Sequence, residues 1–113
     1  MSNFDALSMV KFGNEESLKA FLFENGVQHK TFAETLADLG ITVQRFPLMD
    51  ANPNDLDDWL AMHEVEHLSL STALNVNNPI NLMDVDFNNE ASFYDWLATH
   101  LSLHQQISDT LGL

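Results

Sequence analysis

Three stretches of the chain share one pattern of apolar and polar positions at helical spacing. Each stretch has an aromatic residue, two polar residues and two large apolar residues, separated by 4, 4, 3 and 4 positions. These are Phe21, Asn25, His29, Phe32 and Leu36, then Trp59, His63, His67, Leu70 and Leu74, then Trp96, His100, His104, Ile107 and Leu111. This spacing places each set on one stripe of a helix. The polar members are therefore predicted to point toward the core with their apolar neighbours.

The stretches also resemble one another outside this stripe. The sequence DWLAMHEVEHLSLSTALNV from Asp58 returns as DWLATHLSLHQQISDTLGL from Asp95, 37 positions later. The first stretch is a more divergent copy, since FGNEESLKAFLFEN from Phe12 aligns with FNNEASFYDWLATH from Phe87. All five histidines of the chain fall on the two polar positions of the stripe. We therefore expect three repeats of one helical unit, at about residues 4–40, 46–76 and 80–113.

Helix start and stop signals predict where the three helices lie. The first is expected from about residue 15 to 39, kinked or split at Asn25-Gly26, because Gly is costly inside a helix. The others are expected at about 54–74 and 89–111, with Gly40 and Gly112 ending helices and short extended connectors between them. One unit is too small to bury a core alone. The prediction is a single all-α domain, 1–113, folded as a compact helical bundle.

The charge composition of the chain argues against nucleic acid and lipid membranes as binding partners. The chain has 4 Lys and Arg against 17 Asp and Glu, a formal net charge of −13, which repels phosphate backbones and anionic lipid. Direct binding to nucleic acid or to a membrane is therefore not expected. There is no Cys for disulfides or thiolate metal sites. The sequence has no long apolar run and no basic N-terminal signal region, so we expect a soluble protein made inside the cell.

A layer of polar side chains is expected inside the bundle if the three stripes face one another. Its members are Asn25, His29, His63, His67, His100 and His104, next to an aromatic layer of Phe21, Trp59 and Trp96. The pattern favours a hydrogen-bonded layer that sets the register of similar helices. Two alternatives stay open. His63, His67, His100 and His104 could bind Zn²⁺ or a related ion through four nitrogens, or the buried imidazoles could act as a proton switch.

The second stretch also contains a literal H-E-x-x-H, from His63 through Glu64 to His67, as in zinc peptidases. The repeat argues against a zinc hydrolase, because the position of Glu64 is Leu101 in the third copy and Gly26 in the first. The sequence has no Gly-rich phosphate loop, no G-x-S-x-G and no Cys nucleophile. We expect a protein without enzymatic activity and without a required cofactor.

The C-terminal motif Trp96-Leu97-x-x-His100-x-x-x-His104-x-x-Ile107-x-x-x-Leu111-Gly112-Leu113 resembles the end of small acidic proteins encoded in structural gene clusters of tailed bacteriophages. Those chains often end in a W-[LM]-x-x-H-x-x-x-H-x-x-[IM] helix followed by L-G-[LI]. The resemblance implies a structural or adaptor protein of the virion, associated with capsid, neck or tail and made in the host cytoplasm. It also implies other virion proteins as partners and several copies in a symmetric assembly.

Two apolar segments outside the predicted helices, residues 41–49 and 80–87, are candidate binding surfaces. A metal-binding protein that uses the paired H-x-x-x-H helices is the alternative to the structural role.

Overall fold

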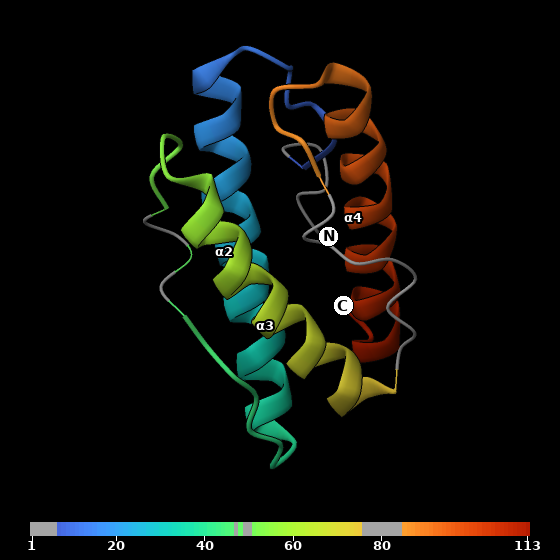
Figure 1. The fold of residues 1–113 in the computed structure, drawn as a ribbon. Coiled ribbons are helices and arrows are strands. Elements are labelled where there is room, and N and C mark those ends of the chain that lie inside the picture. The colour runs from blue at the N-terminus through green and yellow to red at the C-terminus, as the bar shows by residue number, and fades with distance from the viewer. Residues whose placement is uncertain (1–6, 47, 49–50, 76–84) are drawn as a thin grey trace.

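Three long helices form most of the part of the chain that the structure describes, and each packs against the other two (Figure 1). The computed structural model describes residues 7–46, 48, 51–75 and 85–113. Within these ranges the helices are α2 (Glu15–Asp38), α3 (Leu56–Leu74) and α4 (Glu90–Leu111), and there is no β-strand. The predicted all-α helical bundle is confirmed.

Helix α2 runs unbroken through Asn25 and Gly26. The split considered near this pair is therefore wrong. Gly26 is buried in the bundle, and the packing of a helix face outweighs a local propensity cost of about 1 kcal/mol. Helices α3 and α4 begin within two residues of their expected starts.

The first and third helices begin with the same capping arrangement. The side chain of Asn14 accepts a hydrogen bond from the backbone N–H of Ser17 at 2.9 Å, and Asn89 accepts one from Ser92 at 3.0 Å. An Asn side chain at this position satisfies one of the free N–H groups of the first helical turn. Asn14 and Asn89 are 75 positions apart in the sequence, and so are Ser17 and Ser92. The alignment of the two stretches pairs these residues.

The bundle core is built in layers across the three helices. Phe21, Trp59 and Trp96 form the aromatic layer, with ring centroids 5.9 to 6.2 Å apart and edge-to-face geometry at each contact. Aromatic pairs favour this arrangement over face-to-face stacking. Beyond the polar residues, the apolar layer of Phe32, Leu70 and Ile107 is at most 2% exposed. The polar residues are therefore enclosed between two apolar layers.

The connector that follows α2 lies along α3. The backbone N–H of Gln44 donates to Ser69 Oγ at 2.9 Å, and the N–H of Phe46 donates to Glu66 Oε2. Leu48 is buried, whereas Pro47, Met49 and Asp50 lie outside the described residues. The connector thus brings its backbone to the outer side of the polar layer.

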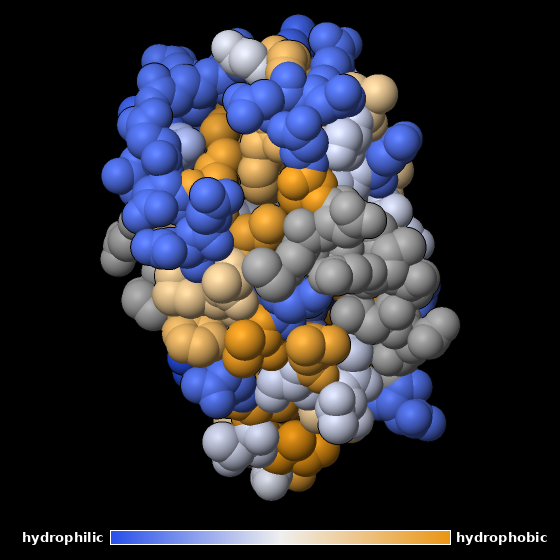
Figure 2. Space-filling model, viewed as in Figure 1, coloured by the Kyte–Doolittle hydropathy of each residue, from blue (hydrophilic) through white to orange (hydrophobic). Residues whose placement is uncertain are grey.

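Most of the second candidate binding surface, residues 80–84, lies outside the described part of the chain. Hydrophilic residues cover much of the face seen in Figure 2, with apolar patches between them. Exposed large apolar side chains include those of Leu39, Ile41 and Leu68. None of the described helices is both long and apolar enough to span a lipid bilayer.

Candidate metal centre

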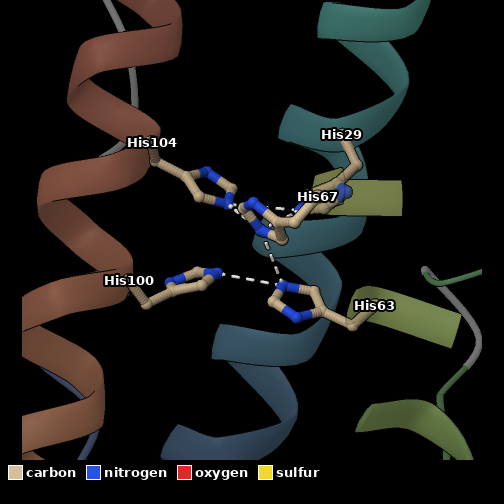
Figure 3. Close-up of side chains that lie close together, drawn as sticks. All are labelled: His29, His63, His67, His100 and His104. Atoms are coloured by element: carbon tan, nitrogen blue, oxygen red, sulfur yellow. Dashed lines mark hydrogen bonds between the residues drawn. The ribbon is translucent and has the colours of Figure 1, made fainter. Parts of the chain in front are cut away.

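Five imidazoles from three helices meet inside the bundle. Helix α2 supplies His29, helix α3 supplies His63 and His67, and helix α4 supplies His100 and His104 (Figure 3). Every one of these side chains is at most 2% exposed. The pairs on α3 and α4 are four residues apart, so each pair projects from one face of its helix. The bundle therefore directs every histidine of the chain to one place.

The rings present their Nε2 atoms to one another. The Nε2–Nε2 contacts are His29–His67 at 3.0 Å, His29–His104 at 3.2 Å, His67–His104 at 3.3 Å, His63–His67 at 3.1 Å and His63–His100 at 3.0 Å. All five potential ligand atoms lie within 4.8 Å of one another. His67 takes part in three of these contacts and is the hub of the cluster.

Two of the rings are oriented by partners on their outer side. The Nδ1–H of His29 donates to Glu66 Oε1 at 3.0 Å, and the Nδ1–H of His104 donates to Gln28 Oε1 at 2.9 Å. Glu66 accepts a second hydrogen bond from the backbone N–H of Phe46, which holds its carboxylate in place. A hydrogen on Nδ1 leaves the lone pair on Nε2, and this is the tautomer that a histidine needs to bind a metal through Nε2.

Hydrogen bonding among the rings cannot satisfy all of these contacts. A neutral imidazole carries one N–H donor and one nitrogen acceptor. With their hydrogens on Nδ1, His29 and His104 both present Nε2 lone pairs, and these two acceptors face each other at 3.2 Å. Neither atom has a hydrogen to donate to the other. A cation between the rings, either a proton or a metal ion, would turn this repulsion into attraction.

Burial opposes a proton on His104 and on the three histidines His63, His67 and His100. The pKa values of His63, His67, His100 and His104 are lowered well below 6.5, first because burial removes water from the charged form. The positive charge of neighbouring protonated imidazoles lowers these pKa values further. The four rings are therefore neutral near pH 7, and their lone pairs are available to a metal ion.

Five of the ten separations between ligand nitrogens are close to those of a coordination shell, and all ten are within 4.8 Å. With metal–nitrogen bonds of about 2.1 Å, neighbouring donor atoms are about 3.4 Å apart in a tetrahedron and about 3.0 Å apart in an octahedron. The five contacts of 3.0 to 3.3 Å fall between these values. Five donors exceed the four of a tetrahedral site, so the number of rings favours the octahedral arrangement.

The tryptophans of the aromatic layer cover one side of the cluster. Trp59 stacks on His63 with ring centroids 4.4 Å apart and planes at 21°, and Trp96 stacks on His100 at 4.8 Å and 14°. Stacking on a rigid neighbour limits rotation of the imidazole. The aromatic layer therefore holds two of the possible ligands in orientation and separates the cluster from water.

The structure brings together the four histidines predicted as metal ligands and adds His29, which the sequence placed only in the polar layer. Asn25, the sixth residue of that layer, is 0% exposed on α2. Glu66 and Gln28 were not predicted from the sequence as partners of the rings. The repeat offered a signal for His29, because it occupies the same position as His67 and His104.

The H-E-x-x-H motif of α3 does not have the arrangement of a zinc peptidase site in this structure. The carboxylate that orients a ring of the cluster is that of Glu66, which donates no hydrogen but accepts one from His29. His63 and His67 are each 0% exposed. A zinc peptidase needs an open position on its metal for the scissile peptide, and complete burial of both motif histidines denies access to a peptide.

Comparison with known proteins gives no relative: no family model, no curated protein and no solved structure matches this chain.

Proposed function

We propose that the protein binds one divalent transition-metal ion through the Nε2 atoms of His29, His63, His67, His100 and His104. The observation that carries this proposal is the contact of His29 Nε2 with His104 Nε2 at 3.2 Å, while the Nδ1 of each ring faces an acceptor oxygen. A layer built only for hydrogen bonding would pair donors with acceptors. A layer built for a cation directs acceptors toward one point, as the Nε2 atoms of His29 and His104 are directed.

The ion is one that accepts five or six nitrogen donors. Imidazole suits Fe, Ni, Cu and Zn, whereas Mg²⁺ and Ca²⁺ prefer oxygen. Zn²⁺ in structural sites is almost always tetrahedral and would leave one of the five rings without a role. We therefore propose Fe²⁺, Co²⁺ or Ni²⁺ as the class of ion that fits best, with Zn²⁺ as the four-coordinate alternative.

The bound ion has a structural role. It would join α2, α3 and α4 through ligands from all three, so its binding free energy adds to that of folding. The carboxylate of Glu66 lies 3.0 Å from His29 Nδ1 and supplies one negative charge beside the cluster. The net charge of −13 further attracts cations to the molecule. This role requires no substrate cleft and agrees with the expectation of a protein without enzymatic activity.

The role of a structural or adaptor protein in a tailed-phage virion stays a prediction from the resemblance of the C-terminal motif. A bundle tied by a buried ion would suit a small subunit that must remain folded in an assembly. Isolation of the native assembly that contains this chain, followed by identification of its other proteins, tests this prediction. A free protein found in no particle would contradict it.

Metal titration tests the proposed site. Apoprotein without an affinity tag should bind one equivalent of Co²⁺, with the weak visible absorption of a five- or six-coordinate ion. Intense absorption would indicate a tetrahedral site. His67→Gln should weaken binding most, because His67 Nε2 touches three of the other nitrogen atoms. Leu68→Gln is the matched control, since this neighbour on α3 is 50% exposed.

Two outcomes would contradict the proposal. The first is a native protein that takes up no Co²⁺, Ni²⁺, Zn²⁺ or anaerobic Fe²⁺. The second is equal loss of binding in His67→Gln and Leu68→Gln. The chain has no sixth histidine and no Cys, so tight binding of such an ion has no competing imidazole or thiolate site to explain it.

A further inference from the structure

Asn25 lies on α2 between the aromatic layer and His29. Phe21, four residues before it, contacts the two tryptophans at ring centroid distances of 6.2 and 5.9 Å. His29, four residues after it, meets imidazoles of the other two helices at 3.0 and 3.2 Å. Residues four apart share a helix face. Asn25 therefore faces the bundle axis at the level of His63 and His100.

The Asn25 amide is buried and has no partner among the described residues. Its side chain is 0% exposed, and neither Nδ2 nor Oδ1 has a hydrogen bond to the part of the chain that the structure describes. Buried amide groups are almost always hydrogen-bonded, because burial without a partner is costly. A buried amide with both its donor and its acceptor free, on the helix face that carries His29, points to a ligand beside the cluster.

The side chain of Asn25 is shorter than those of the histidines at the equivalent positions of α3 and α4. An asparagine amide ends closer to its helix than the Nε2 atom of a histidine would. On α3 and α4 the equivalent positions are filled by His63 and His100, whose Nε2 atoms meet at 3.0 Å. On α2 the shorter side chain of Asn25 supplies no third imidazole at this level of the bundle.

On the basis of the metal site proposed above, we propose that the sixth coordination position of the ion faces Asn25 and takes an exchangeable small ligand. This ligand is water or a small monoanion, hydrogen-bonded to the Asn25 amide. The amide accepts a hydrogen from water through Oδ1 or donates one to an anion through Nδ2. Imidazole ligands carry no negative charge and Glu66 supplies only one, so a divalent ion keeps a positive charge that attracts a monoanion to this position.

Azide binding to the cobalt-loaded protein tests this position. Azide should change the visible spectrum of the wild-type Co²⁺ protein saturably, while chloride at the same ionic strength serves as the reference. Asn25→His supplies a sixth imidazole and should abolish the azide response while one equivalent of Co²⁺ stays bound. Asn25→Ala keeps the position open but removes the hydrogen bond, so the dissociation constant of azide should rise roughly tenfold.

Measurement of Co²⁺ content before azide is added separates this inference from the proposed function. A protein that holds one Co²⁺ but gives no azide response overturns the exchangeable position and leaves the metal site standing. An azide response of Asn25→His equal to that of the wild type also overturns it. If Asn25→His does not fold, an unchanged azide affinity in Asn25→Ala overturns the role of the amide. A protein that binds no Co²⁺ removes the metal site, and this position with it.

Discussion

The Nε2 atoms of His29 and His104 lie 3.2 Å apart, although the Nδ1 hydrogen of each ring is donated elsewhere. Glu66 and Gln28 accept these hydrogens and so determine which nitrogen carries the lone pair. The two lone pairs repel in the metal-free protein, and α2 and α4 hold them together. The stability of the fold should therefore depend on whether a metal ion or a proton is bound between the two rings.

Loading with metal should stabilise the protein against heat. A ligand at about 100 times its dissociation constant adds about 2.7 kcal/mol of stability, and in a domain of this size each kcal/mol raises the melting temperature by several degrees. Calorimetry of the apoprotein with Ni²⁺ or Co²⁺, followed by addition of a chelator, measures the effect. Mg²⁺ is the control, because it prefers oxygen ligands. Equal stabilisation by Mg²⁺ would indicate screening of the −13 net charge and no specific site.

Glu66→Gln should weaken metal binding about 10- to 100-fold, the usual loss when the outer hydrogen-bond partner of a ligand is changed. The two carboxylate oxygens accept from His29 Nδ1 and from the N–H of Phe46. Glutamine has one acceptor oxygen, so one of these two donors must lose its partner or change tautomer. Titration of the wild-type protein and of Glu66→Gln with metal, followed by calorimetry, gives the ratio of their metal affinities.

The matched control for Glu66→Gln is Glu34→Gln, which makes the same change of charge at an exposed position of α2. Its metal affinity should equal that of the wild type within a factor of about two, since an exposed charge is screened by water and salt. Equal losses in both variants would mean that the negative charge acts at long range and that the contact with His29 has no special role.

The metal-free protein should lose stability as the pH falls below about 6.5. His63, His67, His100 and His104 have folded-state pKa values well below that of an unfolded histidine. In that pH range the unfolded chain binds more protons than the folded chain, so acid favours unfolding. Each ring that stays neutral contributes a loss of up to about 1.4 kcal/mol per pH unit. Urea unfolding between about pH 7.5 and 5 measures it, in a range where carboxylates stay mostly ionised. A flat profile would contradict neutral, buried rings.

The inward stripe could be predicted from the sequence because its period is a local property of each helix. Aromatic, polar and aliphatic residues recur at helical spacing, and the polar members are buried with the others. The helix ends could be predicted for the same reason, since Asn caps and Gly stops act within a few residues. The continuity of α2 through Gly26 could not be predicted in this way, because it depends on the packing of α2 against α3 and α4.

The outer partners of the rings depend on contacts that local patterns do not contain. Glu66 meets His29, 37 positions away, and Gln28 meets His104, 76 positions away. His29 was not predicted as a ligand because the signal used was a pair of histidines four residues apart, and Asn25 occupies the first position of that pair on α2. Asn in place of His at this position of the first stretch therefore removed the signal that would have pointed to His29.

Equivalent caps in the first and third helices should contribute equally to stability. Asn14→Ala and Asn89→Ala each remove a side-chain acceptor from the N–H three residues later, at 2.9 and 3.0 Å. Each should lower the free energy of unfolding by about 1 kcal/mol, measured by urea unfolding with an unchanged slope. Asn88→Ala is the control, because this exposed residue precedes the cap. A cost of near zero at Asn14 beside a full cost at Asn89 would mean that the first unit no longer behaves as a copy of the third.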